Sequence, residues 1–168
     1  MLFKENLTGG EAKYKTDFSF YIDEENFHAS FDAEKSSLES YSELYNADLW
    51  RGNVVEIFID VGRPNSYWEL EVAPNGTMFL AEVTRINDVS ALRMIDENFV
   101  SSTVKRGFDS YHVDISIPLD KMLYNPEYGL RINAFRIEME GDLQYRMALN
   151  PTHLQTFHDM NAFLEFKK

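Results

Sequence analysis

Cysteine is absent from the 168 residues of this chain. A disulfide framework and a thiol nucleophile are therefore both excluded. The absence of cysteine does not indicate whether the protein works in a reducing or an oxidising compartment. A chain of this length can bury a hydrophobic core without disulfide or metal staples. We expect one domain spanning residues 1–168.

Long apolar runs are also missing, and no segment approaches the length of a membrane span. The first residues, Met1 to Asn6, lack the basic start and apolar stretch of a signal peptide. As the sequence stands we expect a cytoplasmic protein, or an extracellular one if a leader has been removed.

Basic residues are scarce, with 16 Lys and Arg against 28 Asp and Glu, which gives a formal net charge of −12. Such a charge repels phosphate backbones and anionic lipid surfaces. We therefore expect neither nucleic acid nor a membrane as a partner.

Motifs of common catalytic centres are missing as well. No serine lies in a Gly-x-Ser-x-Gly context. His153 and His158 lie five positions apart, with no third ligand at a recognisable spacing, so they form no metal motif.

Helical periodicity is rare, and most segments alternate apolar and polar residues with the period of a β-strand. Asp and Glu residues at positions 23–25 and the Asn75-Gly76 pair are typical of turns, and they predict two hairpins. The predicted strands are residues 18–22, 27–31, 54–60, 67–72, 77–81, 111–117, 130–139 and 163–166.

Two less regular segments lie between these strands, residues 33–49 and 85–109. We expect the first to be a long surface loop or a short helix. One helix-like turn is expected near residues 119–123. The pattern predicts an all-β fold, an antiparallel β-sandwich of immunoglobulin-like or jelly-roll-like type.

One segment couples a loop tryptophan to a strand that carries a carboxylate in its middle. Gly52 lets the chain turn directly after Trp50, so the indole can be presented from a loop. Glu56 lies in an apolar strand, where a carboxylate must reach solvent or find a partner. That partner is either a ligand or a basic residue of a neighbouring strand, Arg131 or Arg136.

Four blocks of this sequence resemble the family 9 carbohydrate-binding modules. The resemblance extends to their wider group of look-alike domains, rather than to a xylanase-attached member, and runs from about Phe18 to the end of the chain. The blocks are LWRGNVVEIFID (49–60), YWELEVAPNGT (67–77), NAFRIE (133–138), and NPT with FHDMNAF (150–163).

The resemblance implies a β-sandwich that grips the end of a glycan chain between two aromatic side chains. Trp50 matches the first of these, and Glu56 matches an acid that hydrogen-bonds sugar hydroxyls. Phe157 falls where the family has its second tryptophan, which keeps an aromatic face but offers less stacking area.

Further polar contacts are expected, two of them from the resemblance. A polar residue of the family falls near Glu69 and an amide near Asn133, while Arg136 and His158 are additional candidates. The alternative for His158 is a side chain that is exposed to solvent and contacts no sugar. Some modules of the family hold calcium ions structurally, but this sequence presents no ligand set that identifies such a site.

These residues suit sugar binding because pyranose C–H faces stack on aromatics and hydroxyls need carboxylate, amide and guanidinium partners. We predict noncatalytic binding of a mono-, oligo- or polysaccharide in carbohydrate catabolism, with no catalytic residue and no required cofactor. A separate glycoside hydrolase is a candidate partner.

Two alternatives remain open. One is a structural or protein-interaction sandwich in which Trp50 packs at the edge of the core and Phe157 packs within it. The other is a glycoside hydrolase that pairs Glu56 with Glu69 or Glu71. An exposed Trp50 facing an aromatic across a groove favours sugar binding, and a buried Trp50 favours the structural role.

Overall fold

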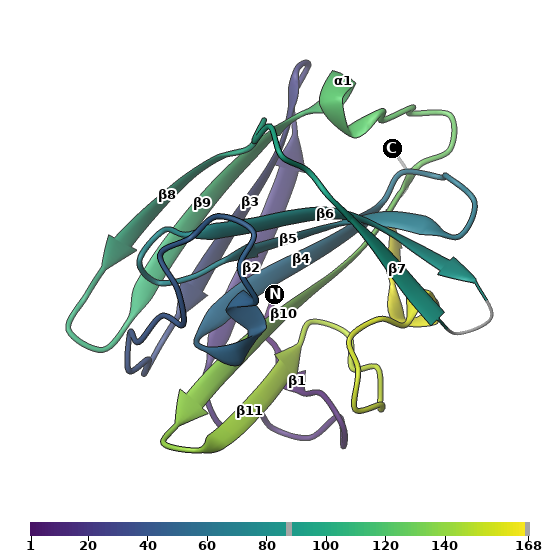
Figure 1. The fold of residues 1–168 in the computed structure, drawn as a ribbon. Coiled ribbons are helices and arrows are strands. Elements are labelled where there is room, and N and C mark those ends of the chain that lie inside the picture. The colour runs from purple at the N-terminus through teal and green to yellow at the C-terminus, as the bar shows by residue number, and fades with distance from the viewer. Residues whose placement is uncertain (87–88, 167–168) are drawn as a thin grey trace.

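The computed structural model describes residues 1–86 and 89–166, which form two antiparallel β-sheets (Figure 1). The elements are β1 (Lys4–Glu5), β2 (Thr16–Ile22), β3 (Asn26–Ala33), η1 (Leu49–Arg51), β4 (Val54–Asp60), β5 (Ser66–Val72), β6 (Met78–Ile86), β7 (Val89–Met94), β8 (Ser101–Arg106), β9 (Tyr111–Pro118), α1 (Leu119–Met122), β10 (Leu130–Glu140), β11 (Leu143–Ala148), η2 (Met160–Ala162) and β12 (Leu164–Phe166).

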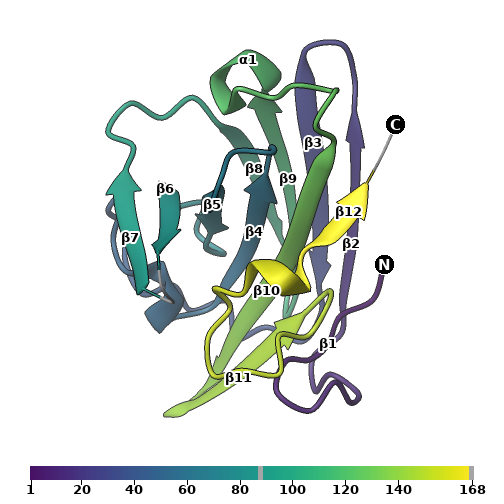
Figure 2. The same ribbon diagram turned by 90° about the vertical axis from the view of Figure 1, so that its right-hand side faces the viewer.

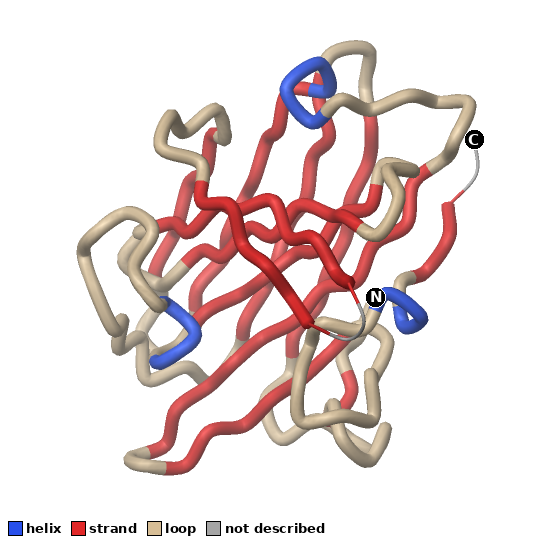
Figure 3. The backbone as a smooth tube through the Cα atoms, turned by 45° about the vertical axis from the view of Figure 1, so that its right-hand side comes forward, coloured by secondary structure: helices blue, strands red, loops and turns tan. Residues whose placement is uncertain are grey.

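The larger sheet has the strand order β1-β11-β10-β4-β5-β6-β7, with β12 also paired to β10. The smaller sheet has the order β2-β3-β9-β8. In Figure 2 the smaller sheet lies as a second layer against β4 and β10. Within the described part of the chain, three short helical turns are the only helical elements (Figure 3). The predicted all-β antiparallel sandwich is therefore confirmed.

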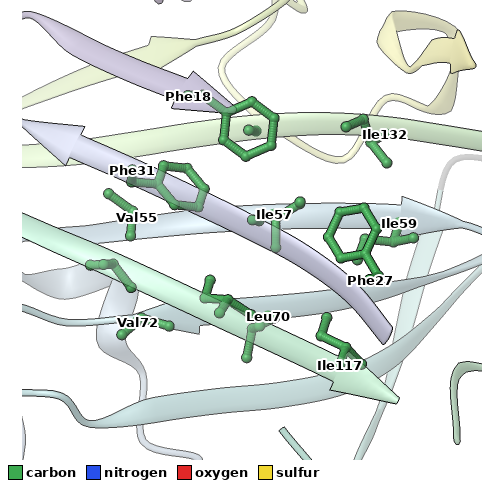
Figure 4. Packing of buried hydrophobic residues seen from close by; sticks show 14 of the residues in the cluster. Phe18, Phe27, Phe31, Val55, Ile57, Ile59, Leu70, Val72, Ile117 and Ile132 are labelled. Carbon is green, nitrogen blue, oxygen red and sulfur yellow. The ribbon is translucent and has the colours of Figure 1, made fainter. Parts of the chain in front are cut away.

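The main core fills the space between the two sheets, and it follows from the period-two alternation of the strands. Strands β2, β3, β4, β5, β9 and β10 contribute every second side chain to this space. Figure 4 shows Phe27 and Phe31 of β3 packed against Val55, Ile57 and Ile59 of β4. Trp68 also faces this core, and its indole N–H donates to the carbonyl of Met122 at 3.0 Å, as a buried tryptophan requires.

A second apolar cluster covers the outer face of the larger sheet. Its buried residues come from η1, the central strands of that sheet and the segment before β12, and they include Leu49, Phe58, Tyr67, Phe79, Phe135, Phe157 and Phe163. All residues of β4 and β5 are consequently buried, on both faces of the sheet. Any polar group on the outer face of these two strands lies in a mostly apolar environment.

The structure corrects the segment 85–109, which contains strands β7 and β8 in its described part. Residues 87–88 of that segment lie outside the described residues. Most side chains of β7 and β8 are exposed, so neither strand shows the clear alternation that marks a half-buried strand. The edge strand β1 and its neighbour β11 were not predicted either. The segment 33–49 is a long loop as far as η1, as expected, and α1 forms at the predicted turn.

No helix among the described residues has both the length and the apolar composition needed to cross a bilayer.

Arg136 lies fully buried on the inner face of β10, between the sheets. Its guanidinium donates to the Glu138 carboxylate at 2.8 Å and to the Thr16 hydroxyl at 3.1 Å. It also donates to the backbone carbonyls of Lys15 and Glu34. Arg136 thus ties β10 to the smaller sheet and faces away from the outer side of the larger sheet, contrary to its predicted role in sugar contact.

Replacement of Arg136 by methionine should destabilise the protein strongly. Arg136→Met keeps much of the side-chain volume but leaves the buried Glu138 carboxylate without its cation, which costs about 3–5 kcal/mol of unfolding free energy. Urea denaturation of the variant measures this loss. Arg106→Met is the control, because Arg106 is exposed and its guanidinium donates to the Leu38 carbonyl rather than to a buried carboxylate. Equal stability losses in the two variants would contradict the assigned role of Arg136.

Candidate functional site

A pocket of about 230 Å³ lies on the outer face of the larger sheet. Its floor is formed by side chains of β4 and β5, and its walls by η1, β11 and the segment before η2. The lining residues are Trp50, Glu56, Phe58, Glu69, Glu71, Ile137, Arg146, Gln155, Thr156, Phe157 and His158. Four residues that were predicted from separate parts of the sequence, Trp50, Glu56, Glu69 and Phe157, therefore meet here, together with His158.

Three carboxylates converge on the pocket floor, and strand register explains why. Glu56 of β4 lies directly opposite Glu71 of β5, and Glu69 is two positions away on the same face of β5. One oxygen from each carboxylate lies within 4.8 Å of the other two. The three residues are only 3%, 4% and 2% exposed for Glu56, Glu69 and Glu71 respectively.

These carboxylates are poorly neutralised by their surroundings. Glu56 Oε1, Glu69 Oε2 and Glu71 Oε2 have no hydrogen-bond partner among the described residues. The alternative that Glu56 pairs with an arginine of the neighbouring strand is wrong, because Arg131 donates to Asp60 at 3.2 Å and Arg136 lies on the inner face.

Burial raises the pKa of each of the three carboxyl groups, and their mutual repulsion adds to the effect for Glu56 and Glu71. The pKa of Glu69 rises to about 8, chiefly through burial. Arg146 opposes the shift of the Glu56 pKa through its positive charge. At pH 7 the Glu69 carboxyl group is therefore mostly protonated.

Trp50 presents the open aromatic surface of the pocket. Its side chain is 44% exposed, and the Arg51 guanidinium lies 5.0 Å from the ring. The turn after it depends on Gly52, because a Cβ at that position would lie 2.7 Å from the backbone nitrogen of Tyr41. This turn folds Trp50 back toward Glu56. The two residues therefore line one pocket, although a fully extended chain would hold residues six positions apart far from each other.

Phe157 differs from Trp50 in being only 7% exposed. Its ring stacks on Phe135 with centroids 4.2 Å apart and an interplanar angle of 16°. It lines the pocket from within the outer apolar cluster. The two predicted aromatic walls are therefore unequal, one open and one largely covered.

His158 is not a solvated histidine. Its ring lies almost parallel to Phe58, at 19° and 5.3 Å between centroids, and its Nδ1 lies 2.6 Å from the Tyr67 hydroxyl. Burial lowers the pKa of His158 to about 4, with Arg85 adding to the shift. The imidazole is thus neutral at pH 7 and serves the pocket as a hydrogen-bonding group.

Arg146 is a pocket residue that the sequence prediction missed. Its guanidinium donates to Gln144 Oε1 at 2.7 Å and to the carbonyl of Gln155, and it lies 5.9 Å from the Phe157 ring. The signal was weak because β11 was not recognised as a strand. Glu71 was not chosen as a sugar contact either, although its period-two relation to Glu69 was enough to place both on one face.

Asn133 does not line the pocket, contrary to its predicted role. Its amide donates to the Asn150 carbonyl at 2.7 Å and its oxygen accepts from the Asn150 backbone N–H at 3.0 Å. Asn133 therefore fixes the start of the segment that carries Phe157 and His158.

No protein-family model matches this sequence, and no curated protein matches it. Solved structures do match. A candidate carbohydrate-binding protein from Bacteroides uniformis aligns with 98% of this chain and 86% of its own, with a TM-score of 0.76 and 15% identity.

Two structures of a family 9 carbohydrate-binding module from Caldicellulosiruptor kristjanssonii also match. The one in complex with glucose has a TM-score of 0.64 at 14% identity and aligns with 99% of this chain and 83% of its own. The one in complex with cellotriose has a TM-score of 0.66 at 15% identity and aligns with 93% and 75%. The fold of this protein is therefore that of the family 9 modules.

The carboxylates on the pocket floor should reduce the stability of the empty protein at neutral pH. Since folding raises the pKa of Glu69 from 4.5 to about 8, its free-energy cost is absent below the unfolded pKa and grows as the pH rises above it. We expect Glu69→Gln to raise the unfolding free energy at pH 7 by about 1–3 kcal/mol, and to have little effect near pH 4.

Thermal unfolding in the presence of a chelator, at pH 4 and pH 7, measures this difference. Glu140→Gln is the control, because the exposed Glu140 pairs with Lys13 and its pKa is lowered by that contact. The control should not stabilise the protein at pH 7. A Glu69→Gln variant that is less stable than the wild type at pH 7 would contradict the assignment.

Proposed function

We propose that this protein binds carbohydrate without catalysis, at the pocket formed by η1, β4, β5 and β11. The observation that supports this most is the exposed Trp50 ring beside a floor of hydrogen-bonding groups in a single pocket. An aromatic face takes the apolar side of a pyranose, and carboxylate and guanidinium groups take its hydroxyls. The fold agrees, because two of the similar structures hold glucose and cellotriose.

In the proposed mode a terminal sugar ring stacks on Trp50 and reaches the floor with its hydroxyls. Glu56 and Glu69 accept hydrogen bonds, and Arg146 donates them. Phe157 closes the opposite side with the edge that its packing on Phe135 leaves open. Sugar binding in this mode therefore depends more on stacking against Trp50 and on hydrogen bonds to the floor than on two equal aromatic walls.

The structural alternative fits less well, because a tryptophan that caps a core edge would not leave 44% of its side chain exposed to a pocket. The glycosidase alternative fits less well for a geometric reason. Glycosidases place their two carboxyl groups on either side of the scissile bond. Glu56 and Glu71 instead lie opposite each other on adjacent strands, so both approach a ligand from the same sheet face.

A wider role follows as part of the proposal. A binding site for a glycan end suits a protein that holds carbohydrate for breakdown by a separate glycoside hydrolase.

Tryptophan fluorescence tests the proposed binding directly. Of the two tryptophans, Trp68 is buried between the sheets, so a change on adding sugar reports Trp50. We expect saturable changes for some member of a panel of glucose, cellotriose, xylotriose and host-type glycans. By calorimetry, Trp50→Ala should weaken the binding of that glycan at least about tenfold, because it removes the stacking contribution of roughly 1 kcal/mol together with the buried apolar area.

Phe108→Ala is the matched control, since Phe108 is fully exposed and does not line the pocket. It should bind like the wild type. Unchanged fluorescence across the whole panel at millimolar sugar would contradict the proposal, as would full affinity in Trp50→Ala.

A further inference from the structure

Three acceptor oxygens on the pocket floor have no donor among the described residues. They are Glu56 Oε1, Glu69 Oε2 and Glu71 Oε2, which are buried and belong to residues that line the pocket. Unpartnered buried carboxylate oxygens are costly, and proteins keep such groups where they contact a ligand. A sugar hydroxyl can satisfy one or two of these oxygens, but a neutral sugar brings no positive charge that would stabilise three ionised carboxylates so close together.

The spacing of the three carboxylates suits a single metal ion. One oxygen from each residue lies within 4.8 Å of the other two. Calcium binds oxygen at about 2.3–2.6 Å, so two of its ligands lie at most about 5 Å apart. Magnesium demands near-octahedral geometry, keeps several of its waters and is usually held by only one or two carboxylates, so a site with three protein carboxylates suits calcium better. The ligand set contains only carboxylate oxygens, which hard cations prefer.

Arg146 does not take the place of such an ion. Its guanidinium is directed to the Gln144 side chain and the Gln155 carbonyl. It therefore remains at the wall of the pocket and leaves the centre of the three carboxylates open to a ligand.

We propose that Glu56, Glu69 and Glu71 bind a divalent cation, with Ca²⁺ as the best fit, on the floor of this pocket. Three carboxylates leave part of the six to eight calcium ligand positions open. The backbone carbonyls of β4 and β5 accept hydrogen bonds in the antiparallel ladder, so they are not free to bind the ion. The remaining coordination positions of the ion therefore face the pocket. There, water or two neighbouring sugar hydroxyls complete the coordination; this last step rests on the proposed sugar binding.

Calorimetric titration of the whole protein with CaCl₂, without sugar, tests the cation site by itself. We expect saturable binding of one ion per chain and an at least tenfold weaker affinity in Glu71→Gln. Glu140→Gln, which removes an exposed carboxylate, should bind like the wild type and so corrects for the acidic surface. No binding at millimolar Ca²⁺, or equal affinity in the two variants, would overturn the proposal.

Terbium luminescence locates the bound ion, because Tb³⁺ replaces Ca²⁺ and is excited through a nearby indole. Ca²⁺ should displace the emitting Tb³⁺. Trp50→Phe should reduce the emission severalfold while calorimetry still detects Ca²⁺ binding. Emission that persists fully in Trp50→Phe places the ion elsewhere and would also overturn the proposal.

Sugar titrations in Ca²⁺ and in EDTA separate this inference from the proposed function. Sugar affinity that falls in EDTA supports both. Equal sugar affinity in both buffers, with no Ca²⁺ binding, overturns the cation site and leaves sugar binding intact. Ca²⁺ binding without binding of any sugar overturns the proposed sugar binding and leaves the cation site intact. Glucosamine binding in EDTA that Ca²⁺ does not affect would make an ammonium group the occupant and overturn the cation site.

Discussion

The pairing of β4 with β5 is the constraint on which the rest of the site depends. Antiparallel register sets Glu56 opposite Glu71, and the pleat then brings Glu69 to the same face. That face is covered by an apolar cluster rather than by solvent. Because burial and register are fixed by the whole sandwich, the three carboxylates cannot separate without loss of the central strand pair. The fold therefore holds three buried carboxyl groups together, at a cost in free energy.

In the proposed function, the carboxyl groups that bind the ligand also lower the stability of the protein. A buried carboxyl with a raised pKa lowers the stability of the empty protein at neutral pH. The apolar packing on both sides of the larger sheet offsets that cost, through the core between the sheets and the cluster around Phe58 and Phe135. A buried pair of opposite charges behaves differently, as the ion pair between Arg136 and Glu138 at 2.8 Å shows. Their charges serve the packing of the two sheets and need no ligand.

Much of the fold was predictable because most strands have one face in the core, which gives a period-two signal. The hairpins of β2 with β3 and β5 with β6 follow from alternation and turn chemistry. β7 and β8 gave no such signal because their side chains are mostly exposed.

The site was only partly predictable. Glu56 was found because a carboxylate in an apolar strand is a local anomaly. Arg136 was misplaced because the face that a strand residue occupies depends on register with its neighbours, which sequence alone does not supply. Arg146 was missed for a related reason, since its position depends on β11 pairing with β10.

The unequal walls of the pocket suggest how its specificity would arise. Phe157 is held against Phe135 and adds little open aromatic surface, whereas Trp50 is exposed on a turn that Gly52 permits. Stacking on one ring distinguishes sugars poorly, because many pyranoses have an apolar face. Discrimination must then come from the floor, where fixed carboxylates on paired strands sample few alternative positions. A ligand that leaves these acceptors unsatisfied loses more free energy than one that stacks imperfectly. The selectivity of this pocket is therefore expected to follow the pattern of groups presented to Glu56, Glu69 and Glu71.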